Sequence, residues 1–179
     1  MGNPSPLSAV RPAVRMPALM RFVVLVALIA AAGCGKEIGD ECIVNSDCDP
    51  EFAARTCDSS LPGGYCTILG CDFNSCPEEA ACIRFFTGHF SNRCCGPDCA
   101  PDQKVTCSLD ELCSLAGYCV PRSSESRYCM RRCDSNDDCR DGYECRDLEL
   151  MKSHGGEPVL APGQLIDETA PKFCAPAPA

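Results

Sequence analysis

The sequence predicts a small disulfide-rich fold, built from tandem stapled units with short β-hairpins and little regular secondary structure. The chain has 179 residues and 19 cysteines, a density typical of disulfide frameworks in exported proteins. After residue 33, only about 16% of residues are Leu, Ile, Val or Phe, and the segment contains 25 acidic and 13 basic residues. Such a composition buries too little apolar surface to offset the entropy lost on folding, so covalent crosslinks must contribute.

Residues 1–33 have the pattern of an export signal. They contain three arginines and no acidic residue, and an uninterrupted apolar run occupies residues 22–32. At about 1.5 Å per residue, this run covers roughly half of a ~30 Å hydrocarbon core, so it is too short to span a membrane. A basic start, a short apolar segment and small residues at its end are typical of a cleavable signal. We therefore expect export.

The apolar run ends in Ala31-Ala32-Gly33-Cys34. This segment resembles the lipobox of bacterial lipoproteins, in which lipid is attached to the cysteine thiol and the signal is cleaved before it. The resemblance implies a membrane anchor on Cys34, and Gly35 in place of Asp favours the outer membrane. The cysteine count agrees, because 19 is odd and setting Cys34 aside leaves 18 that can pair completely. The alternative is an ordinary signal peptide with Cys34 free or paired.

The other cysteines follow a repeat of four per unit, with units beginning at Cys42, Cys71, Cys99 and Cys133. Five residues separate the second and third cysteines in three of the units. Of the three pairings that four cysteines allow, we favour first-to-third and second-to-fourth. The predicted disulfide cysteines are Cys42, Cys48, Cys57, Cys66, Cys71, Cys76, Cys82, Cys94, Cys95, Cys99, Cys107, Cys113, Cys119, Cys129, Cys133, Cys139, Cys145 and Cys174.

These units divide the chain after the signal. We expect an N-terminal tether at 34–41, units one and two at 42–95, units three and four at 96–174, and a frayed tail at 175–179. In this division, unit two closes at the adjacent Cys94-Cys95, and the spare member of that pair bonds to Cys119.

The repeated unit resembles short stapled modules of secreted proteins, including parts of whey acidic protein and Dickkopf-type domains. The best match is CDSNDDCRDGYEC at 133–145. With the lipobox, the chain resembles the Cys-rich lipoproteins of large-genome soil bacteria. The resemblance implies a location and an architecture.

Local signals predict few regular elements. Gly63-Gly64 and Pro97-Asp98 are expected to form turns between short strands. The segments 76–82 and 107–113 fit either a strand or a single helical turn, because Pro77 suits a first helical residue and Leu109 and Leu112 are spaced for one turn. The cysteine-free gap between Arg146 and Phe173 predicts a mobile insertion at 146–173, with a partner-binding loop as the alternative.

Two clusters could be sites. The acidic loop 134–141 matches the first three ligand positions of an EF-hand with Asp134, Asn136 and Asp138, but Cys139 and Cys145 replace the required Gly and Glu. We interpret it as a solvated loop, with calcium binding as the alternative. Residues 84–90 combine Arg84 with Phe85, Phe86, His89 and Phe90, and we expect them to pack locally.

The sequence supports no enzyme, cofactor or metal site. Structural zinc sites usually begin with C-x2-C, a spacing that this chain lacks, and none of the common catalytic motifs occurs. The net charge after residue 33 is −12, which repels nucleic acid.

We therefore expect a membrane-anchored, disulfide-stabilised cell-envelope lipoprotein that acts as a binding or structural module. Its partners would be the membrane, through lipid on Cys34, and an unknown protein or envelope component. The alternative is a secreted-type peptidase inhibitor with units similar to those of whey acidic protein.

Overall fold

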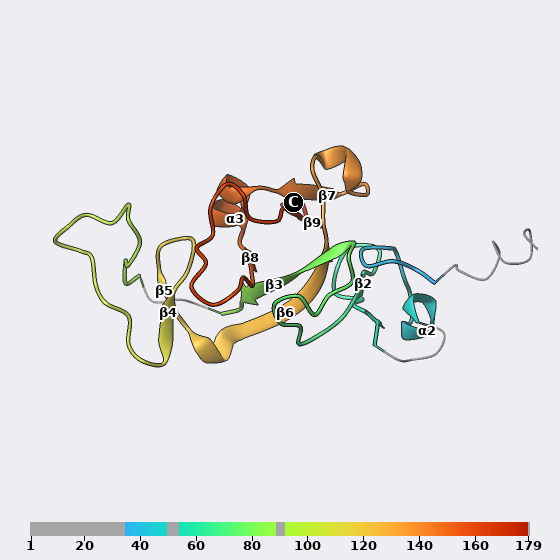
Figure 1. The fold of residues 1–179 in the computed structure, drawn as a ribbon, viewed down its shortest axis with the longest axis horizontal. Coiled ribbons are helices and arrows are strands. Elements are labelled where there is room, and N and C mark those ends of the chain that lie inside the picture. The colour runs from blue at the N-terminus through green and yellow to red at the C-terminus, as the bar shows by residue number, and fades with distance from the viewer. Residues whose placement is uncertain (1–34, 50–53, 89–91, 179) are drawn as a thin grey trace, which may run out of the picture. The chain divides into compact units, whose positions relative to one another are not determined.

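The computed structural model describes residues 35–49, 54–88 and 92–178. The predicted signal and lipidation site, together with His89 and Phe90, lie outside these ranges. Figure 1 shows a fold of short strands and few helices, as predicted. The strands are β1 (Thr56–Cys57), β2 (Cys66–Thr67), β3 (Ala80–Phe86), β4 (Glu111–Cys113), β5 (Cys119–Pro121), β6 (Glu125–Arg131), β7 (Tyr143–Arg146), β8 (Glu157–Pro158) and β9 (Phe173–Pro176). The helices are α2 (Asn45–Cys48) and α3 (Leu148–His154), with 3-10 turns η1 (Arg122–Ser124) and η2 (Asn136–Asp138).

All 18 cysteines predicted to pair are in disulfides. Eight of the nine bonds form four modules with first-to-third and second-to-fourth pairing, the connectivity favoured from the sequence. Module 1 contains Cys42–Cys57 and Cys48–Cys66, and module 2 contains Cys71–Cys82 and Cys76–Cys129. Module 3 contains Cys95–Cys113 and Cys107–Cys119, and module 4 contains Cys133–Cys145 and Cys139–Cys174.

Every module contains the same antiparallel strand pair. The third and fourth cysteines lie directly opposite each other across β1–β2, β3–β6, β4–β5 and β7–β9. Opposite residues in a sheet project to the same face, so both sulfurs reach the loop that carries the first and second cysteines. A module is therefore a strand pair with a short loop bonded twice to one face.

The predicted boundaries of the middle units are wrong. The second unit closes at Cys129 rather than at Cys94-Cys95, and the third begins at Cys95 and ends at Cys119. The ninth disulfide is Cys94–Cys99, so neither member of the adjacent pair bonds to Cys119. The cause is nesting, because module 3 lies entirely within the segment that joins β3 to β6.

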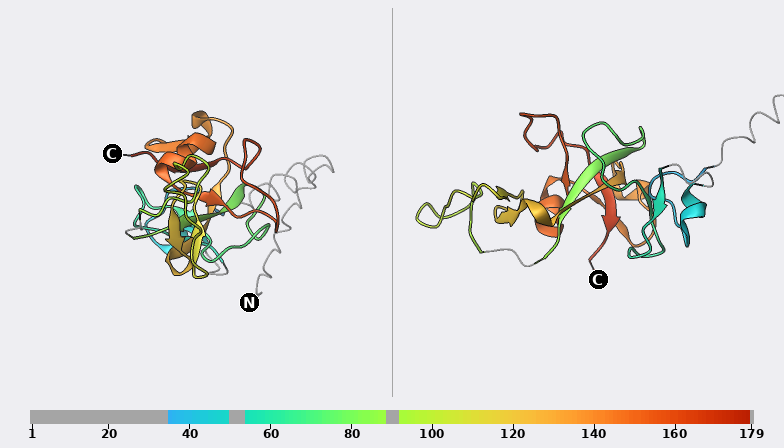
Figure 2. Two further views of the ribbon diagram at one scale, coloured as in Figure 1. Left: turned by 90° about the vertical axis from the view of Figure 1, so that its left-hand side faces the viewer. Right: turned by 90° about the horizontal axis from the view of Figure 1, so that it is seen from below.

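The long pair β3–β6 brings the two ends of that insertion together. Seven residues of each strand are in register, from Ala80 opposite Arg131 to Phe86 opposite Glu125. This pairing places Cys82 opposite Cys129, although 46 residues separate them in the sequence. Modules 1 and 3 lie at opposite ends of the body formed by the described residues (Figures 1 and 2).

The main core lies under β3 and β6 and includes the start of the described chain. Ile38 is fully buried together with Tyr65, Ile83 and Phe173. Next to it, the Gly39 N–H donates to the Cys66 carbonyl at 2.9 Å, and the Cys66 N–H donates to Asp40 at 2.9 Å. The prediction of a tether over 34–41 is therefore wrong from residue 38 onwards, because this segment is paired with β2.

The predicted mobile insertion is also corrected. Within 146–173, Asp147 caps helix α3, because its carboxylate accepts the Leu150 N–H at 3.0 Å. Met151 on the helix is buried. Strand β8 then pairs with β3 to complete a three-stranded sheet in the order β6-β3-β8. The segment is ordered by packing against module 2, a contact that its own composition does not indicate.

The tail is likewise part of the fold. Ala175 is fully buried and Pro176 belongs to β9, opposite Tyr143 of β7. The prediction of a frayed tail is wrong for these two residues. The strand β9 has to extend beyond Cys174, because Cys174 pairs in the middle of the β7–β9 ladder.

The turn signals are confirmed, whereas helical turns do not form at 76–82 and 107–113. Gly63-Gly64 joins β1 to β2, and a Cβ on Gly64 would lie 1.9 Å from the Cys42 carbonyl oxygen, so only glycine fits. Pro97-Asp98 also forms a turn. The segments 76–82 and 107–113 each turn once and then enter a strand, because their last residue is a third cysteine paired across a ladder.

Nine disulfides in a chain of this size indicate an exported protein. In the part of the chain that the structure describes, no helix has the length and apolar character needed to cross a membrane.

Candidate binding surface

The modules share one plan and differ in the segment between the third and fourth cysteines, which we call the joining segment. These segments run over residues 58–65 in module 1, 83–128 in module 2, 114–118 in module 3 and 146–173 in module 4. Binding residues tend to lie on loops that a rigid scaffold holds in place. The joining segments are therefore the first place to look for a site.

Glu157 connects the joining segments of three modules. Its side chain is buried, and Oε2 accepts from Arg84 of β3 through Nη2 at 2.7 Å and Nε at 3.0 Å. Its other oxygen accepts the backbone N–H of Leu115, in the turn between β4 and β5. A buried carboxylate needs charged and polar partners of this kind. Glu157 therefore fixes module 3 and the joining segment of module 4 against module 2.

A groove of about 750 Å³ lies beside this contact, between the turn of module 3 and the joining segment of module 4. We call it the Glu157 groove. Leu115 and Tyr118 of module 3 contribute to its apolar lining, as do Leu148, Leu165 and Ile166 of the joining segment of module 4. Tyr118 is 45% exposed and Leu165 is 85% exposed. The groove therefore presents apolar side chains from two loops that are joined by the hydrogen bond from the Leu115 N–H to Glu157.

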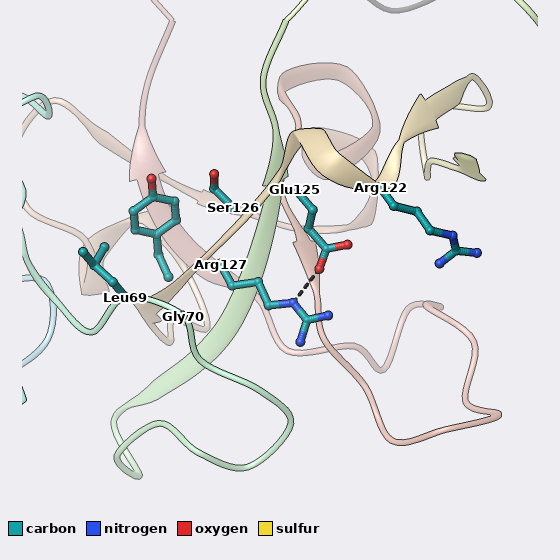
Figure 3. A pocket seen from close by; sticks show the side chains of 7 residues that line it. Leu69, Gly70, Arg122, Glu125, Ser126 and Arg127 are labelled. Atoms are coloured by element: carbon teal, nitrogen blue, oxygen red, sulfur yellow. Dashed lines mark hydrogen bonds and ion pairs between the residues drawn. The ribbon is translucent and has the colours of Figure 1, made fainter. Parts of the chain in front are cut away.

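A second hollow, of about 670 Å³, lies along the outer edge of β6 (Figure 3). Its lining is more polar. Arg127 bonds to Glu125 at 2.5 Å and to Asp72 at 3.0 Å, while Arg122 extends away from this pair (Figure 3). Leu69 and Gly70 close the other end, where the Gly70 N–H donates to the Arg127 carbonyl at 2.9 Å. Most of its charges are already paired with one another, which leaves little to recognise a ligand.

An apolar recess of about 260 Å³ adjoins the core. Tyr65, Phe85 and Tyr128 line it, and Phe85 stacks edge-on against Tyr128 and Phe173. Burial raises the pKa of Tyr65 to about 12. Burial also lowers the pKa of Arg146, which Glu144 holds at 2.9 Å. The recess is small, and core side chains form most of its walls, with Asp58, Ser60 and Thr87 also lining it.

The acidic loop predicted as a possible calcium site uses its oxygens internally. The Asp138 carboxylate accepts the N–H groups of Asp134 and Ser135 at 2.8 and 2.9 Å, which lowers its pKa. The Asn136 side chain accepts the Cys145 N–H at 2.8 Å. These bonds close the loop and attach it to β7.

Module 1 repeats this arrangement. Asp47 accepts from Ile43 and Val44, which lowers the pKa of Asp47, and Asn45 accepts from Cys57. The shared pattern Asn-x-Asp-Cys is therefore a structural signature that attaches the loop to the third cysteine.

The predicted patch at 84–90 serves packing where it is described. Arg84 pairs with Glu157 and lies 5.6 Å from the ring centre of Phe86, and Phe85 packs in the core. His154 bonds through Nδ1 to Glu144 at 2.7 Å, beside Arg146. No hydroxyl or thiol among the described residues hydrogen-bonds to this histidine, so the group is not arranged as an activated nucleophile.

Four groups of three cysteine sulfurs lie within 4.8 Å of one another, one group in each module. Every one of these sulfurs is in a disulfide. Metal binding by cysteine requires the thiolate, so these groups are stacked disulfides rather than metal sites.

The sequence prediction did not include the Glu157 groove. Glu157, Leu115 and Leu165 carry no signal in the sequence, because their proximity depends on the nesting of module 3. Tyr118 did carry a signal. Each fourth cysteine follows an aromatic residue, in Tyr65-Cys66, Tyr118-Cys119, Tyr128-Cys129 and Phe173-Cys174, and this pattern identifies Cys119 as the closing cysteine of module 3. Comparisons with protein families, with curated proteins and with solved structures give no match to this chain.

Proposed function

We propose that the protein is a cell-envelope lipoprotein, anchored through lipid on Cys34, whose folded part is a non-enzymatic binding module. The observation that carries the proposal is the Glu157 groove. Two joining segments from different modules present apolar side chains there, on a scaffold held by nine disulfides. A site held rigid before binding loses less entropy when a partner docks.

The chemistry of the groove favours a partner with apolar side chains. Leu165 and Tyr118 are too exposed to contribute much to the core, and aromatic and large aliphatic side chains are typical anchors at interfaces. Lys104 and Lys152 also line the groove. We therefore propose a protein or envelope component that inserts an apolar side chain between Tyr118 and Leu165.

The anchor is tested by feeding an alkyne fatty acid to a bacterial host that makes the full chain. We expect the label on the protein, and a mature N-terminus at Cys34 by mass spectrometry. Cys34→Ser should abolish the label. The matched control is Cys94→Ser/Cys99→Ser, which removes one disulfide and should keep the label. Labelling that persists in Cys34→Ser would contradict the anchor.

The binding site is tested by placing a photoreactive phenylalanine at position 165 in cells. We expect a specific crosslinked product that is lost when Tyr118→Ala is added. Position 109 provides the control, because Leu109 is 100% exposed and lies outside the groove. Equal crosslinking from positions 109 and 165 would show that the groove has no special role.

Peptidase inhibition remains the second candidate, because one feature favours it. Leu109 is fully exposed on a loop that Cys107–Cys119 closes, and Arg93 braces this loop through Glu111 at 2.6 Å and the Thr106 carbonyl at 3.0 Å. The loop turns at this point, however, since the Glu111 N–H donates to Ser108 at 3.0 Å. An enzyme that binds an extended strand would have to open that turn. A panel of serine peptidases decides, and inhibition lost in Leu109→Gly would support this candidate.

A further inference from the structure

We propose that the module 1 end of the protein lies against the lipid bilayer, with Ile43 and Val44 in contact with the membrane surface. The proposal rests on the lipid anchor proposed above and adds an orientation to it. The membrane would then be a second binding partner of the folded part, through a surface separate from the Glu157 groove.

The chain between the anchor and the fold is short. Ile38 is fully buried, and Glu37 is already bonded through its N–H to the Asp40 carboxylate at 2.8 Å. Only four residues lead from Cys34 to Ile38. An extended chain covers at most about 3.6 Å per residue, so this distance is at most about 14 Å. The folded part therefore cannot move far from the membrane surface.

The first described residues are bonded to module 1. The Arg55 guanidinium donates to the Lys36 carbonyl at 2.6 Å, and Lys36 Nζ donates to the Glu41 carbonyl at 2.5 Å. These bonds hold the first described residues along module 1. In Figures 1 and 2, this segment and α2 lie at one end of the body, and module 3 lies at the other. The end next to the anchor is therefore module 1.

The module 1 end presents two exposed apolar side chains. Ile43 is 86% exposed and Val44, the residue directly before α2, is 52% exposed. Their backbone N–H groups are both held by the Asp47 carboxylate, at 2.8 and 3.1 Å. The pair is thus a rigid apolar projection two residues after Glu41. An apolar projection held near a bilayer is suited to insertion among the headgroups.

Charge selects the kind of lipid. The carboxylates at this end are those of Glu37, Asp40, Glu41 and Asp47. Lys36 and Arg55 lie beside them, and Arg131 is 3.4 Å from Glu37 and 3.7 Å from Asp40. These cations offset only part of the acidic charge, so the surface does not favour anionic headgroups. The contact we propose is therefore apolar, with a zwitterionic headgroup region, and the anchor makes it effective by raising the local concentration of the projection at the membrane.

The chain contains no tryptophan, so one introduced tryptophan reports its own surroundings. The full-length lipidated protein is reconstituted into phosphatidylcholine vesicles, with or without bromine on the acyl chains. For Ile43→Trp and Val44→Trp, we expect the tryptophan emission maximum to lie at a shorter wavelength than in the same variant unfolded in denaturant without detergent. We also expect the emission intensity to fall when the lipid is brominated. The matched control is Leu109→Trp on module 3. Its emission intensity and its emission maximum should be the same in vesicles with and without brominated acyl chains.

Three outcomes separate the two proposals. Quenching at positions 43 and 44 but not at 109 supports the orientation. A protein that floats with the vesicles while all three tryptophans stay unquenched overturns the orientation and leaves the anchor intact. A protein that carries no lipid and does not float with the vesicles overturns the anchor, and the orientation falls with it.

Discussion

The Cys76–Cys129 disulfide should contribute more to stability than any other bond in the protein. It closes the longest loop, with a sequence separation of 53 residues, whereas Cys94–Cys99 closes the shortest, with a separation of 5. In the chain-entropy model, a crosslink stabilises the fold by restricting the unfolded chain, and the effect grows with the logarithm of loop length. The model gives about 4 kcal/mol for a loop of 53 residues and about 2 kcal/mol for a loop of 5 at 25 °C.

Two effects change the stabilisation expected from Cys76–Cys129, in opposite directions. The disulfides of module 3 lie inside the Cys76–Cys129 loop and shorten the free chain, which lowers the entropy term by a few tenths of a kcal/mol. Cys129 is fully buried, so replacing it with alanine also leaves a small void. A void of this kind costs on the order of 1 kcal/mol. The expected difference between the two bonds is therefore about 2 to 3 kcal/mol.

The assay compares Cys76→Ala/Cys129→Ala with Cys94→Ala/Cys99→Ala by guanidinium unfolding without reductant. The free energy of unfolding should fall by about 4 kcal/mol in the first variant and about 2 kcal/mol in the second. Peptide mapping under non-reducing conditions confirms that the other bonds are unchanged. A loss in the second variant equal to or larger than that in the first would refute the reasoning from loop length and the nested connectivity on which it depends.

Three further predictions concern Glu157, Tyr65 and the acidic loop. Glu157→Ala leaves Arg84 and the Leu115 N–H without their partner and should lower the free energy of unfolding by about 3 kcal/mol. The control Glu149→Ala breaks only the exposed pair with Lys152 at 2.8 Å and should change the free energy of unfolding by under about 0.5 kcal/mol. Tyr65 has its pKa raised from 10.0 to about 12, so its stabilising effect of about 3 kcal/mol is complete below pH 10 and is lost as the pH rises through 12. Unfolding measured from pH 9 to 12 should show this loss in the wild type and a smaller slope in Tyr65→Phe. Calcium should give no heat in a calorimetric titration and no change in melting temperature, because Asn136 and Asp138 already accept backbone N–H groups. A saturable heat would show that the acidic loop binds calcium.

The parts of the fold that the sequence predicted are those that depend on local spacing. The five-residue gap before each of Cys82, Cys113 and Cys145 identified the third cysteine of three modules. Gly63-Gly64 identified a turn because two consecutive positive φ angles favour glycine. Within each module, few residues separate these positions, so the sequence order of the cysteines was a reliable guide.

The parts that the sequence did not predict depend on contacts between distant residues. Cys129 closes module 2 only because β3 and β6 pair over seven residues, and the order of cysteines gives no sign of that pairing. The segment 146–173 contains prolines and glycines that favour a loop, yet β8 within it pairs with the edge of β3. The Glu157 groove combines both contacts, so the candidate site was less predictable than the fold.

The nesting of module 3 has a small energetic cost, which explains how one plan accommodates joining segments of such different length. The joining segment, between the third and fourth cysteines, is residues 58–65 in module 1 and 83–128 in module 2. The entropy of closing a loop grows as about 1.5 RT times the logarithm of its length, so the longer segment costs only about 1.5 kcal/mol more than the shorter one. A single second-to-fourth disulfide contributes more than that difference. The joining segments can therefore vary in length and content while the paired third and fourth cysteines keep each module folded, and the surface built from those segments can be specific to one partner.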